Sequence, residues 1–179
     1  MNPKGNINYF RRKFNRFFSK LLINKTSDLN FNQNVSQVKK VLITRPNHRL
    51  GNNLLLTPLV KEVTHIFPNA EIHLFLMGNL GDVVFENYKE ITKIIKLPRK
   101  PFKNILDYFS SWLSLFNHNY DISINANRVS SSGKLAVKIS RSRYKFYNVL
   151  NKDLSDIEDY IHNAKNPIYN LRFQIKNEL

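Results

Sequence analysis

Apolar and polar residues follow two different spacings along the chain from Lys39 onward. Short apolar runs bounded by turn residues predict strands at 41–45, 71–77, 91–97, 121–125 and 144–147. Apolar residues three and four positions apart predict helices at 51–67, 80–88, 102–117 and 130–139. Residues 153–175 are predicted to be mostly helical, with an interruption near Pro167. Strands separated by helices indicate βαβ units, so we expect an α/β fold with a mainly parallel sheet flanked by helices. The apolar strand residues expected in its core are Leu42, Ile43, Ile72, Leu74, Ile94, Ile122 and Ile124.

A basic amphipathic helix is predicted at 7–23, ahead of the α/β pattern. Its apolar stripe recurs at helical spacing and comprises Phe10, Phe14, Phe17, Phe18 and Leu21. A cationic ridge on another side comprises Arg12, Arg16 and Lys20. Such a helix suits an anionic membrane interface. The alternatives are docking of the Phe stripe on the rest of the protein, a transit peptide or a disordered segment. We therefore divide the chain into residues 1–38, a helix with a polar linker, and residues 39–179, an α/β domain.

The composition fits one such domain and indicates an anionic partner. The chain has 179 residues, of which 42% are hydrophobic, which is enough for a core of ordinary size. It has no cysteine, and its five histidines lack ligand spacing, so we expect neither disulfides nor a bound metal. The formal net charge is +15, and residues 1–49 hold eleven Lys or Arg against one acidic residue. A basic excess of this kind implies a lipid surface, a phosphorylated substrate or nucleic acid.

The turn after the first predicted strand holds most of the candidate chemistry. In an open α/β sheet this turn lies at the carboxyl ends of the strands, where ligands bind, and the start of the next helix favours anions. Arg45 and Arg49 could each form paired hydrogen bonds to a carboxylate or phosphate. The candidate binding residues are Arg45, Asn47, Arg49, Gly51 and Asn53, and the candidate catalytic residues are His48 and Asn52. The alternative is that Asn52 or Asn53 caps the helix while the arginines are solvated.

A second polar turn follows the fourth predicted strand. Arg128 is a candidate for a second anion contact, with Ser130 beside it. The alternatives are an exposed surface arginine and an ordinary helix N-cap. Gly133 and Lys134 do not form a P-loop, because no glycine lies five positions before Gly133 and no Ser or Thr follows Lys134. We expect this turn and the first one to lie beside each other at the carboxyl edge of the sheet.

These motifs resemble the opening of glycosyltransferase family 9, the ADP-heptose:lipopolysaccharide heptosyltransferase family. Chains of that family begin with a hydrophobic strand, a turn in which Arg precedes Leu-Gly-Asp or Ile-Gly-Asp, and a helix that carries Leu, Thr and Pro. The matching residues here are Arg45, Leu50, Gly51, Leu56, Thr57 and Pro58. The sequence FPNAEI, which starts at Phe67, resembles the family's step into its second strand. The resemblance extends from about Lys39 to the C-terminus.

The resemblance implies a fold, a reaction and a location. Family 9 enzymes have the GT-B architecture, in which two Rossmann-like domains face a cleft, the N-terminal one holding the acceptor and the C-terminal one the nucleotide-sugar donor. Residues 39–179 would be the Rossmann-like acceptor domain. The donor-binding domain would be absent, so the chain would be a fragment, a truncated product or a domain that works with another chain, and it would be inactive in isolation. The implied reaction is sugar transfer to a lipopolysaccharide or another surface glycan at the cytoplasmic face of the cell membrane. The implied partners are an anionic glycan or glycolipid acceptor and the membrane itself; no cofactor is expected besides the donor.

One position departs from the family pattern. Asn52 stands where the family has its proposed catalytic Asp, and an amide has no basic lone pair at neutral pH to take a proton from the acceptor hydroxyl. Three interpretations stay open: His48 is the base, the proton leaves elsewhere while Asn52 positions the hydroxyl, or transfer activity has been lost.

Two other classes of function are considered. One is a non-catalytic membrane-associated domain derived from such an enzyme. The other is a nucleic-acid binder, which the charge and aromatic residues suggest, but no RNP, KH or helix-turn-helix signature supports specific binding of nucleic acid.

Overall fold

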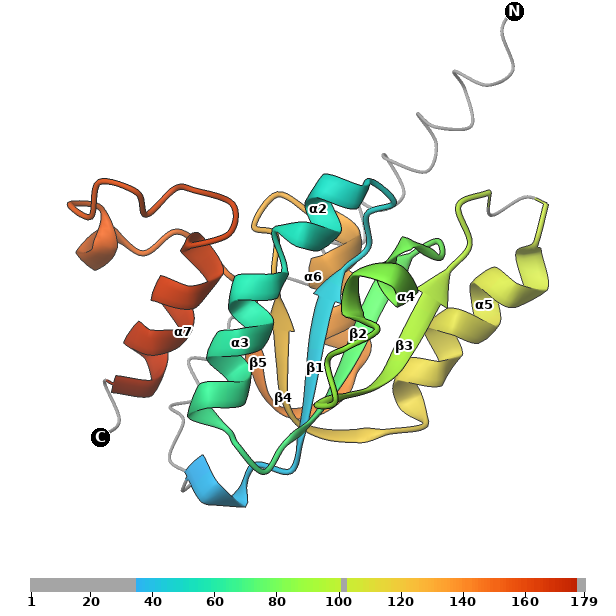
Figure 1. The fold of residues 1–179 in the computed structure, drawn as a ribbon, viewed down its shortest axis with the longest axis horizontal. Helices are drawn as coiled ribbons and strands as arrows, with labels where there is room; N and C mark the ends of the chain where they lie inside the picture. The colour runs from blue at the N-terminus through green and yellow to red at the C-terminus, as the bar shows by residue number, and fades with distance from the viewer. Residues whose placement is uncertain (1–34, 101–102, 177–179) are drawn as a thin grey trace, which may run out of the picture.

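The computed structural model describes residues 35–100 and 103–176, and Figure 1 shows the fold. The amphipathic helix predicted at 7–23 and most of the linker lie outside the described residues, so the division at residue 38 stays a prediction. Over the described ranges, no helix is both long and apolar enough to cross a bilayer.

The predicted parallel sheet is confirmed. All strand pairs are parallel, and the strand order is β3-β2-β1-β4-β5. The strands are β1 (Lys40–Arg45), β2 (Glu71–Met77), β3 (Ile91–Leu97), β4 (Asn119–Asn125) and β5 (Arg141–Phe146). In the central register Val41 lies between Ile72 of β2 and Ile122 of β4. The fold is therefore a Rossmann-like α/β fold.

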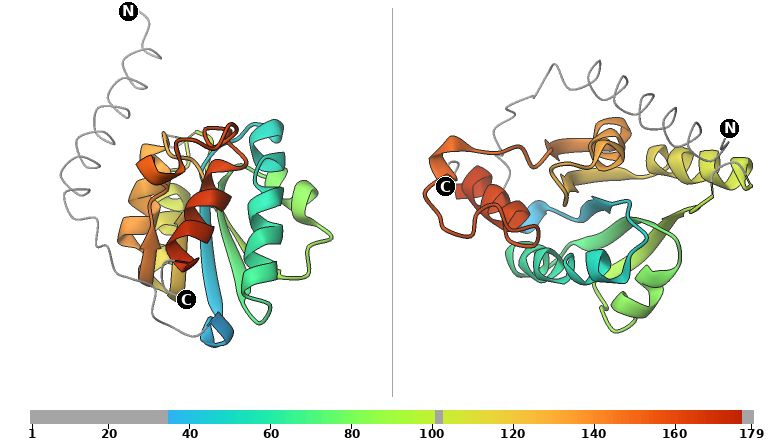
Figure 2. Two further views of the ribbon diagram at one scale, coloured as in Figure 1. Left: turned by 90° about the vertical axis from the view of Figure 1, so that its left-hand side faces the viewer. Right: turned by 90° about the horizontal axis from the view of Figure 1, so that it is seen from above.

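Helices cover both faces of the sheet, as the view from above in Figure 2 shows. One face carries α3 (Thr57–Ile66), α4 (Leu80–Phe85) and α7 (Asn166–Lys176), which pack on alternate strand residues such as Ile43 and Leu74. The opposite face carries α5 (Ile105–Leu113), the 3-10 helix η2 (Ser114–Phe116) and α6 (Ser131–Ile139), which pack on Leu42 and Phe75. Alternation of side chains along each strand produces these two cores. Of the predicted core residues all are buried except Ile94, which is partly buried.

The first predicted helix, 51–67, is in fact two helices. α2 (Leu50–Leu54) ends before α3 begins at Thr57. Proline has no backbone N–H, so Pro58 cannot donate the hydrogen bond that a continuous helix would require at Leu54 O. The Thr57 hydroxyl donates to Leu54 O at 2.9 Å instead. Pro58 therefore occupies the first turn of a new helix, where proline is tolerated.

The segment after β5 also differs from the prediction. Residues 152–165 form a 3-10 turn (Lys152–Leu154) and further turns, and the last helix starts only at Asn166. Pro167 therefore lies in the first turn of α7 instead of interrupting a longer helix. The other predicted bounds shift by a few residues; α5, for example, is Ile105–Leu113 rather than 102–117.

A buried histidine lies near the amino end of β2. His73 is 4% exposed, its Nδ1 is 3.1 Å from the Tyr120 hydroxyl, and its ring meets the His118 ring edge-on at 4.8 Å. Burial above all, together with nearby positive charges and against one carboxylate that raises it, lowers the pKa of His73 to about 4. The charged or titratable groups around it are those of His118, Lys40, Lys93 and Glu71.

This histidine should make stability depend on pH. Because the pKa of His73 is lower in the folded protein than the ordinary 6.5, its contribution is complete above pH 6.5 and is lost as the pH falls toward 4. In urea unfolding at pH 7 and pH 4.5, the wild type should lose about 2 kcal/mol more stability than a His73→Gln variant. An exposed histidine on α3 provides the control, and His65→Gln should behave as the wild type. Equal losses in the wild type and His73→Gln would show that His73 is not buried in its neutral form.

Candidate functional site

The strand order reverses between β1 and β4, at the centre of the sheet. The chain leaves β1 toward the face covered by α3 and leaves β4 toward the face covered by α6. At such a switch point the two connections diverge and leave a crevice outside the carboxyl ends of the strands, where ligands of open α/β sheets bind. The structure thus brings the two predicted polar turns to one edge of the sheet.

Arg45 joins these two turns from inside the protein. This last residue of β1 is 1% exposed; its Nη1 donates to Ala126 O at 3.0 Å, and its Nη2 donates to Asn52 Oδ1 at 3.3 Å. Within the described ranges no carboxylate forms an ion pair with Arg45, and its Nε has no hydrogen-bond partner. Burial lowers the pKa of Arg45, but a guanidinium stays protonated in proteins.

The position of Arg45 differs from the expectation that it contacts a ligand. Both of its terminal nitrogens are engaged by protein oxygens, so the side chain fixes the turn instead of facing solvent. Its positive charge is nevertheless buried at the carboxyl end of β1. An anion bound at this edge would therefore interact with the charge through space and not through contact.

The turn after β4 is built on tight packing around Gly133. A Cβ at this position would lie 2.3 Å from Asn125 Oδ1, so only glycine lets α6 start this close to the end of β4. The Thr44 hydroxyl donates to Gly133 O at 3.1 Å, which attaches α6 to β1. Ser130 caps α6, because its Oγ accepts a hydrogen bond from Gly133 N at 3.0 Å. The Ser130 hydroxyl therefore has a structural partner, as the capping alternative expected.

Two neighbouring cations occupy this same junction. Arg128 is half-buried, and so is Lys134 on the first turn of α6. Burial lowers the pKa of Lys134, and the positive charge of Arg128 lowers this pKa further. Two cations held together in this way suit an anion between them, which keeps Arg128 a candidate contact.

The other predicted residues of the first turn have different environments. Asn53 is 0% exposed, and neither polar atom of its side chain has a partner, so it cannot reach a ligand from this position. Asn47 Oδ1 accepts a hydrogen bond from Arg49 N at 3.0 Å and shapes the turn. Arg49, Gly51 and His48 are exposed. α2 has only five residues, so the long helix expected to supply an anion-binding N-terminus is not present there.

A groove lies beside this turn, along the carboxyl ends of β2 and β3. Its volume is about 1120 Å³, and His48 is the one predicted site residue that lines it. The remaining lining residues that carry charge are Lys96, Arg99, Lys100, Lys103 and Asp107. Lys96 is paired with Asp82, with 2.6 Å between Nζ and Oδ2. No ion pair to Arg99, Lys100 or Lys103 occurs in the described part of the chain, so the groove carries a positive field.

Gly78 sets the shape of this groove. It ends β2 with a φ of 75°, a conformation that residues with a Cβ rarely adopt, and its N–H donates to Leu97 O at 2.9 Å. The aliphatic part of Arg99 lies directly against it, since an added Cβ would be 3.0 Å from Arg99 Cδ. A side chain at position 78 would displace Arg99 from the groove wall.

Arg99, Lys100 and Lys103 were not among the site residues predicted from the sequence. These residues follow the third predicted strand, as the two recognised turns follow the first and the fourth. The same argument, that polar residues after a strand meet at the ligand edge, would have found them. Their only visible signal is a basic cluster around two prolines: Arg99 and Lys100 lie between them, and Lys103 follows the second.

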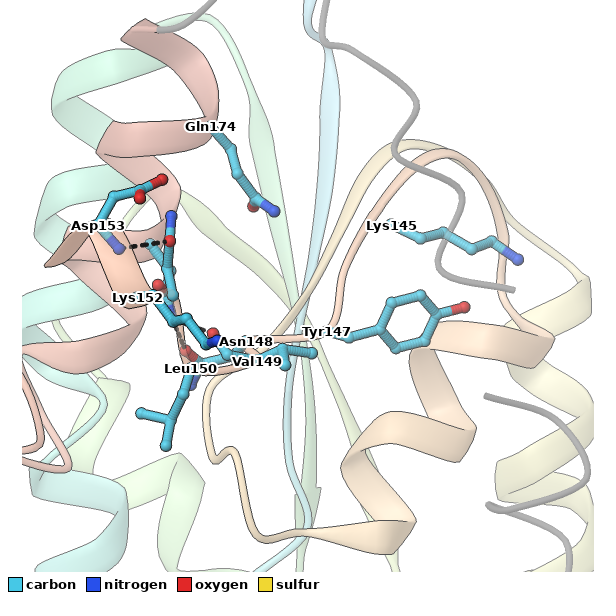
Figure 3. Close-up of a pocket in the computed structure, with 10 residues that line it drawn as sticks. Lys145, Tyr147, Asn148, Val149, Leu150, Lys152, Asp153 and Gln174 are labelled. Carbon is cyan, nitrogen blue, oxygen red and sulfur yellow. Dashed lines mark hydrogen bonds between the residues drawn. The ribbon is translucent and has the colours of Figure 1, made fainter. Parts of the chain in front are cut away.

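A second pocket, of about 380 Å³, lies beyond the end of β5 (Figure 3). Much of its polar wall is engaged within the protein: Asn170 Nδ2 donates to Val149 O at 3.0 Å, and Asn170 Oδ1 accepts from the Tyr160 hydroxyl at 2.7 Å. Asn148, which has a φ of 56°, receives a further hydrogen bond from Asn170. Figure 3 shows Lys145 and Tyr147 on the side opposite Asp153. The larger groove, in which Arg99, Lys100 and Lys103 form no ion pair with any described residue, is the better candidate site.

Comparison with solved structures identifies similar folds. A glycosyl transferase of family 9 from Veillonella parvula superposes with a TM-score of 0.55 at 20% identity, over 80% of this chain and 43% of its own. The E. coli heptosyltransferase WaaC with ADP gives a TM-score of 0.56 at 12% identity, over 76% of this chain and 47% of its own. The same enzyme with ADP-2-deoxy-2-fluoro heptose gives a TM-score of 0.52 at 11% identity, over 76% of this chain and 48% of its own. No family model and no curated protein matches the sequence.

These comparisons confirm the resemblance at the level of the fold. The structural neighbours are glycosyltransferases, and their fold is the one that the sequence motifs implied. The chain spans less than half the length of each of these structures.

The contact between Arg45 and Asn52 leads to a test of the site's electrostatics. Asn52→Asp should raise the free energy of unfolding at pH 7 by about 1 kcal/mol, because a charge-assisted hydrogen bond is roughly twice as strong as a neutral one. The gain should disappear as the pH falls below about 4, where an aspartate takes up a proton. Urea unfolding of a double-mutant cycle with Arg45→Met isolates the pair. An equal gain in the Arg45→Met background would show that the buried charge is not its cause.

Proposed function

We propose that this chain is the acceptor-side domain of a heptosyltransferase-like glycosyltransferase, which takes a sugar from a nucleotide-sugar donor to a lipopolysaccharide or another surface glycan. The observation that carries the proposal is the cationic groove at the carboxyl edge of the sheet, beside the switch point, on a fold shared with family 9 glycosyltransferases. Fold alone does not determine function, so the argument rests on the chemistry of this groove.

The groove suits an anionic acceptor. Arg99 can bind a carboxylate or phosphate through two parallel hydrogen bonds, and Lys100 and Lys103 act as mobile point charges beside it. Arg128 and Lys134 add positive charge on the other side of the switch point. An acidic sugar or a phosphorylated glycan presents the matching groups. The groove volume of about 1120 Å³ accommodates a short oligosaccharide.

The donor would be bound by a second domain, supplied in cis or by another chain. Its class follows from the structural neighbours, one of which is a heptosyltransferase described with ADP and another with an ADP-heptose analogue. We propose no further cofactor for this reaction. The described residues show no cluster of three or more His, Cys, Asp or Glu side chains that could hold a metal ion.

The arrangement of the first turn bears on which residue takes the proton. Asn52 Oδ1 accepts a hydrogen bond from the Arg45 guanidinium, which fixes the amide as a positioning group. His48 is exposed at the edge of the groove, so its imidazole can reach a hydroxyl of a bound glycan. We therefore assign proton removal to His48 and positioning to Asn52.

The second candidate function is a non-catalytic membrane-associated domain derived from such an enzyme. The same contact favours it, because Asn52 forms with Arg45 a stable pair that contains no base. In both functions the basic amphipathic segment 7–23 would hold the protein at the cytoplasmic face of the membrane.

Binding of an acidic oligosaccharide tests the proposal. The wild type should bind a short oligosaccharide that carries two carboxylated sugars, and should not bind a neutral oligosaccharide of equal length, when measured by calorimetry at low salt. Combined replacement of Arg99, Lys100 and Lys103 by Ala should weaken binding at least about tenfold, because charge-assisted hydrogen bonds are lost. The matched control, Lys145→Ala with Lys152→Ala in the second pocket, should bind as the wild type. If the groove variant and the control variant weaken binding equally, the effect comes from net charge alone, which would contradict the proposal.

A further inference from the structure

Helix α5 exposes an apolar surface that no described part of the chain covers. Leu106 is 84% exposed, and Phe109 and Leu113 are each 60% exposed. Ile105 and Phe116 extend the same surface at its two ends. None of the nine residues of α5 is fully buried. We call Ile105, Leu106, Phe109, Leu113 and Phe116 the α5 surface.

The exposure follows from the way α5 packs. Tyr108 and Trp112 turn toward the sheet, where Trp112 meets Phe75 at a centroid distance of 5.1 Å. Ser111 attaches the helix to the edge strand by donating to Lys96 O at 2.7 Å. The α5 surface therefore points away from the sheet at the outer end of this helical layer, as Figures 1 and 2 show for the helix. A row of large apolar side chains in water marks an interaction surface.

Positive charge borders the α5 surface at both ends. Lys100 and Lys103 precede the helix, and Lys93 lies beyond its far end, where its Nζ is 3.0 Å from His118 Nε2. Asp107 is the one acidic residue within α5. The cationic ridge predicted on residues 7–23 would be repelled by this border, and so would the same border on a second copy of the chain. The charges match an anionic surface.

We propose that the α5 surface inserts into the interface of an anionic lipid bilayer. Leu106, Phe109 and Leu113 enter the boundary between headgroups and acyl chains, and the lysines at the two ends of the helix contact the lipid phosphates. Aromatic and aliphatic side chains flanked by lysine are the combination that interfacial helices use. This contact is separate from the one assigned to residues 7–23.

The contact would also orient the candidate site, a consequence that rests on the proposed function. The groove is lined by Lys103 and Asn104, which immediately precede α5, and by Asp107 in its first turn. A bilayer against α5 therefore lies next to the mouth of the groove. A glycan linked to a membrane lipid could enter the groove while its lipid stays in the bilayer.

Vesicle binding tests the proposal without any glycan. Full-length protein is mixed with vesicles of phosphatidylcholine that contain 30% phosphatidylglycerol, and the bound fraction is measured by cosedimentation. Leu106→Asn with Phe109→Asn should weaken partitioning at least about tenfold, because two inserted apolar side chains are lost. Both residues are exposed, so the fold should be retained, as far-UV circular dichroism can verify. The control, Val149→Asn with Ile161→Asn, removes two exposed apolar residues from the segment after β5 and should bind as the wild type. Equal binding by the Leu106/Phe109 variant and the wild type overturns the proposal.

A probe on α5 identifies what covers it. The chain has no cysteine, so Leu106→Cys gives a single attachment point for a polarity-sensitive fluorophore. Water-like emission in buffer that shifts to the blue with anionic vesicles supports the proposal. Apolar emission in buffer that is independent of protein concentration and unchanged by vesicles would place residues 7–23 on α5 and overturn it. Apolar emission that is lost on dilution would indicate a second copy and would overturn it as well.

Discussion

The Arg45 guanidinium joins the carboxyl ends of β1 and β4 from inside the protein, and the geometry of the ligand edge depends on that contact. A buried cation without a carboxylate partner is costly, and hydrogen bonds to carbonyl and amide oxygens offset only part of the cost. Ala126 O and Asn52 Oδ1 supply those bonds and tie the turn after β4 to the turn after β1. Because Asn52 is neutral, the positive charge of Arg45 stays uncompensated. A bound anion would therefore stabilise the folded carboxyl edge of the sheet, and this edge would in turn favour binding of the anion.

Several cations gather at this edge of the sheet. Arg128 and Lys134 flank the switch point, and Arg99, Lys100 and Lys103 line the groove that opens beside it. The groove ends where α5 begins, and α5 carries its apolar residues into solvent. Polar, cationic and apolar surfaces therefore follow one another over a short distance. These three neighbouring surfaces are complementary to the three parts of a glycolipid: its sugar, its charged group and its lipid.

Much of the fold could be predicted from the sequence. The strands at 71–77 and 91–97 have the predicted bounds, because apolar runs between turn residues have one reasonable assignment. The division between α2 and α3 was missed, since apolar spacing continues through Pro58 and conceals the missing N–H. The exposure of α5 also could not be predicted. Its apolar residues cover both the flank that packs on the sheet and the flank that faces solvent, and spacing alone does not distinguish the two.

The candidate site was predicted in position more than in detail. Strand-to-helix turns placed the candidate residues at the carboxyl edge of the sheet, where His48 lines the groove. The roles of Arg45 and Asn53 could not be predicted, because burial depends on the tertiary packing of α2 and β4 around them. Arg99 reaches the groove only because Gly78 leaves room for its side chain, a contact between residues on two different strand ends.

The most direct measurement of the central claim is amide chemical-shift mapping of the ¹⁵N-labelled protein during titration with an acidic oligosaccharide. The account predicts perturbations that saturate together at Gly78, Lys100, Lys103 and Asn104 and in the turn at 47–49, with little change at 148–153. Perturbations centred on the pocket beyond β5, or spread over all surface lysines without saturation, would contradict the assignment of the groove as the acceptor site.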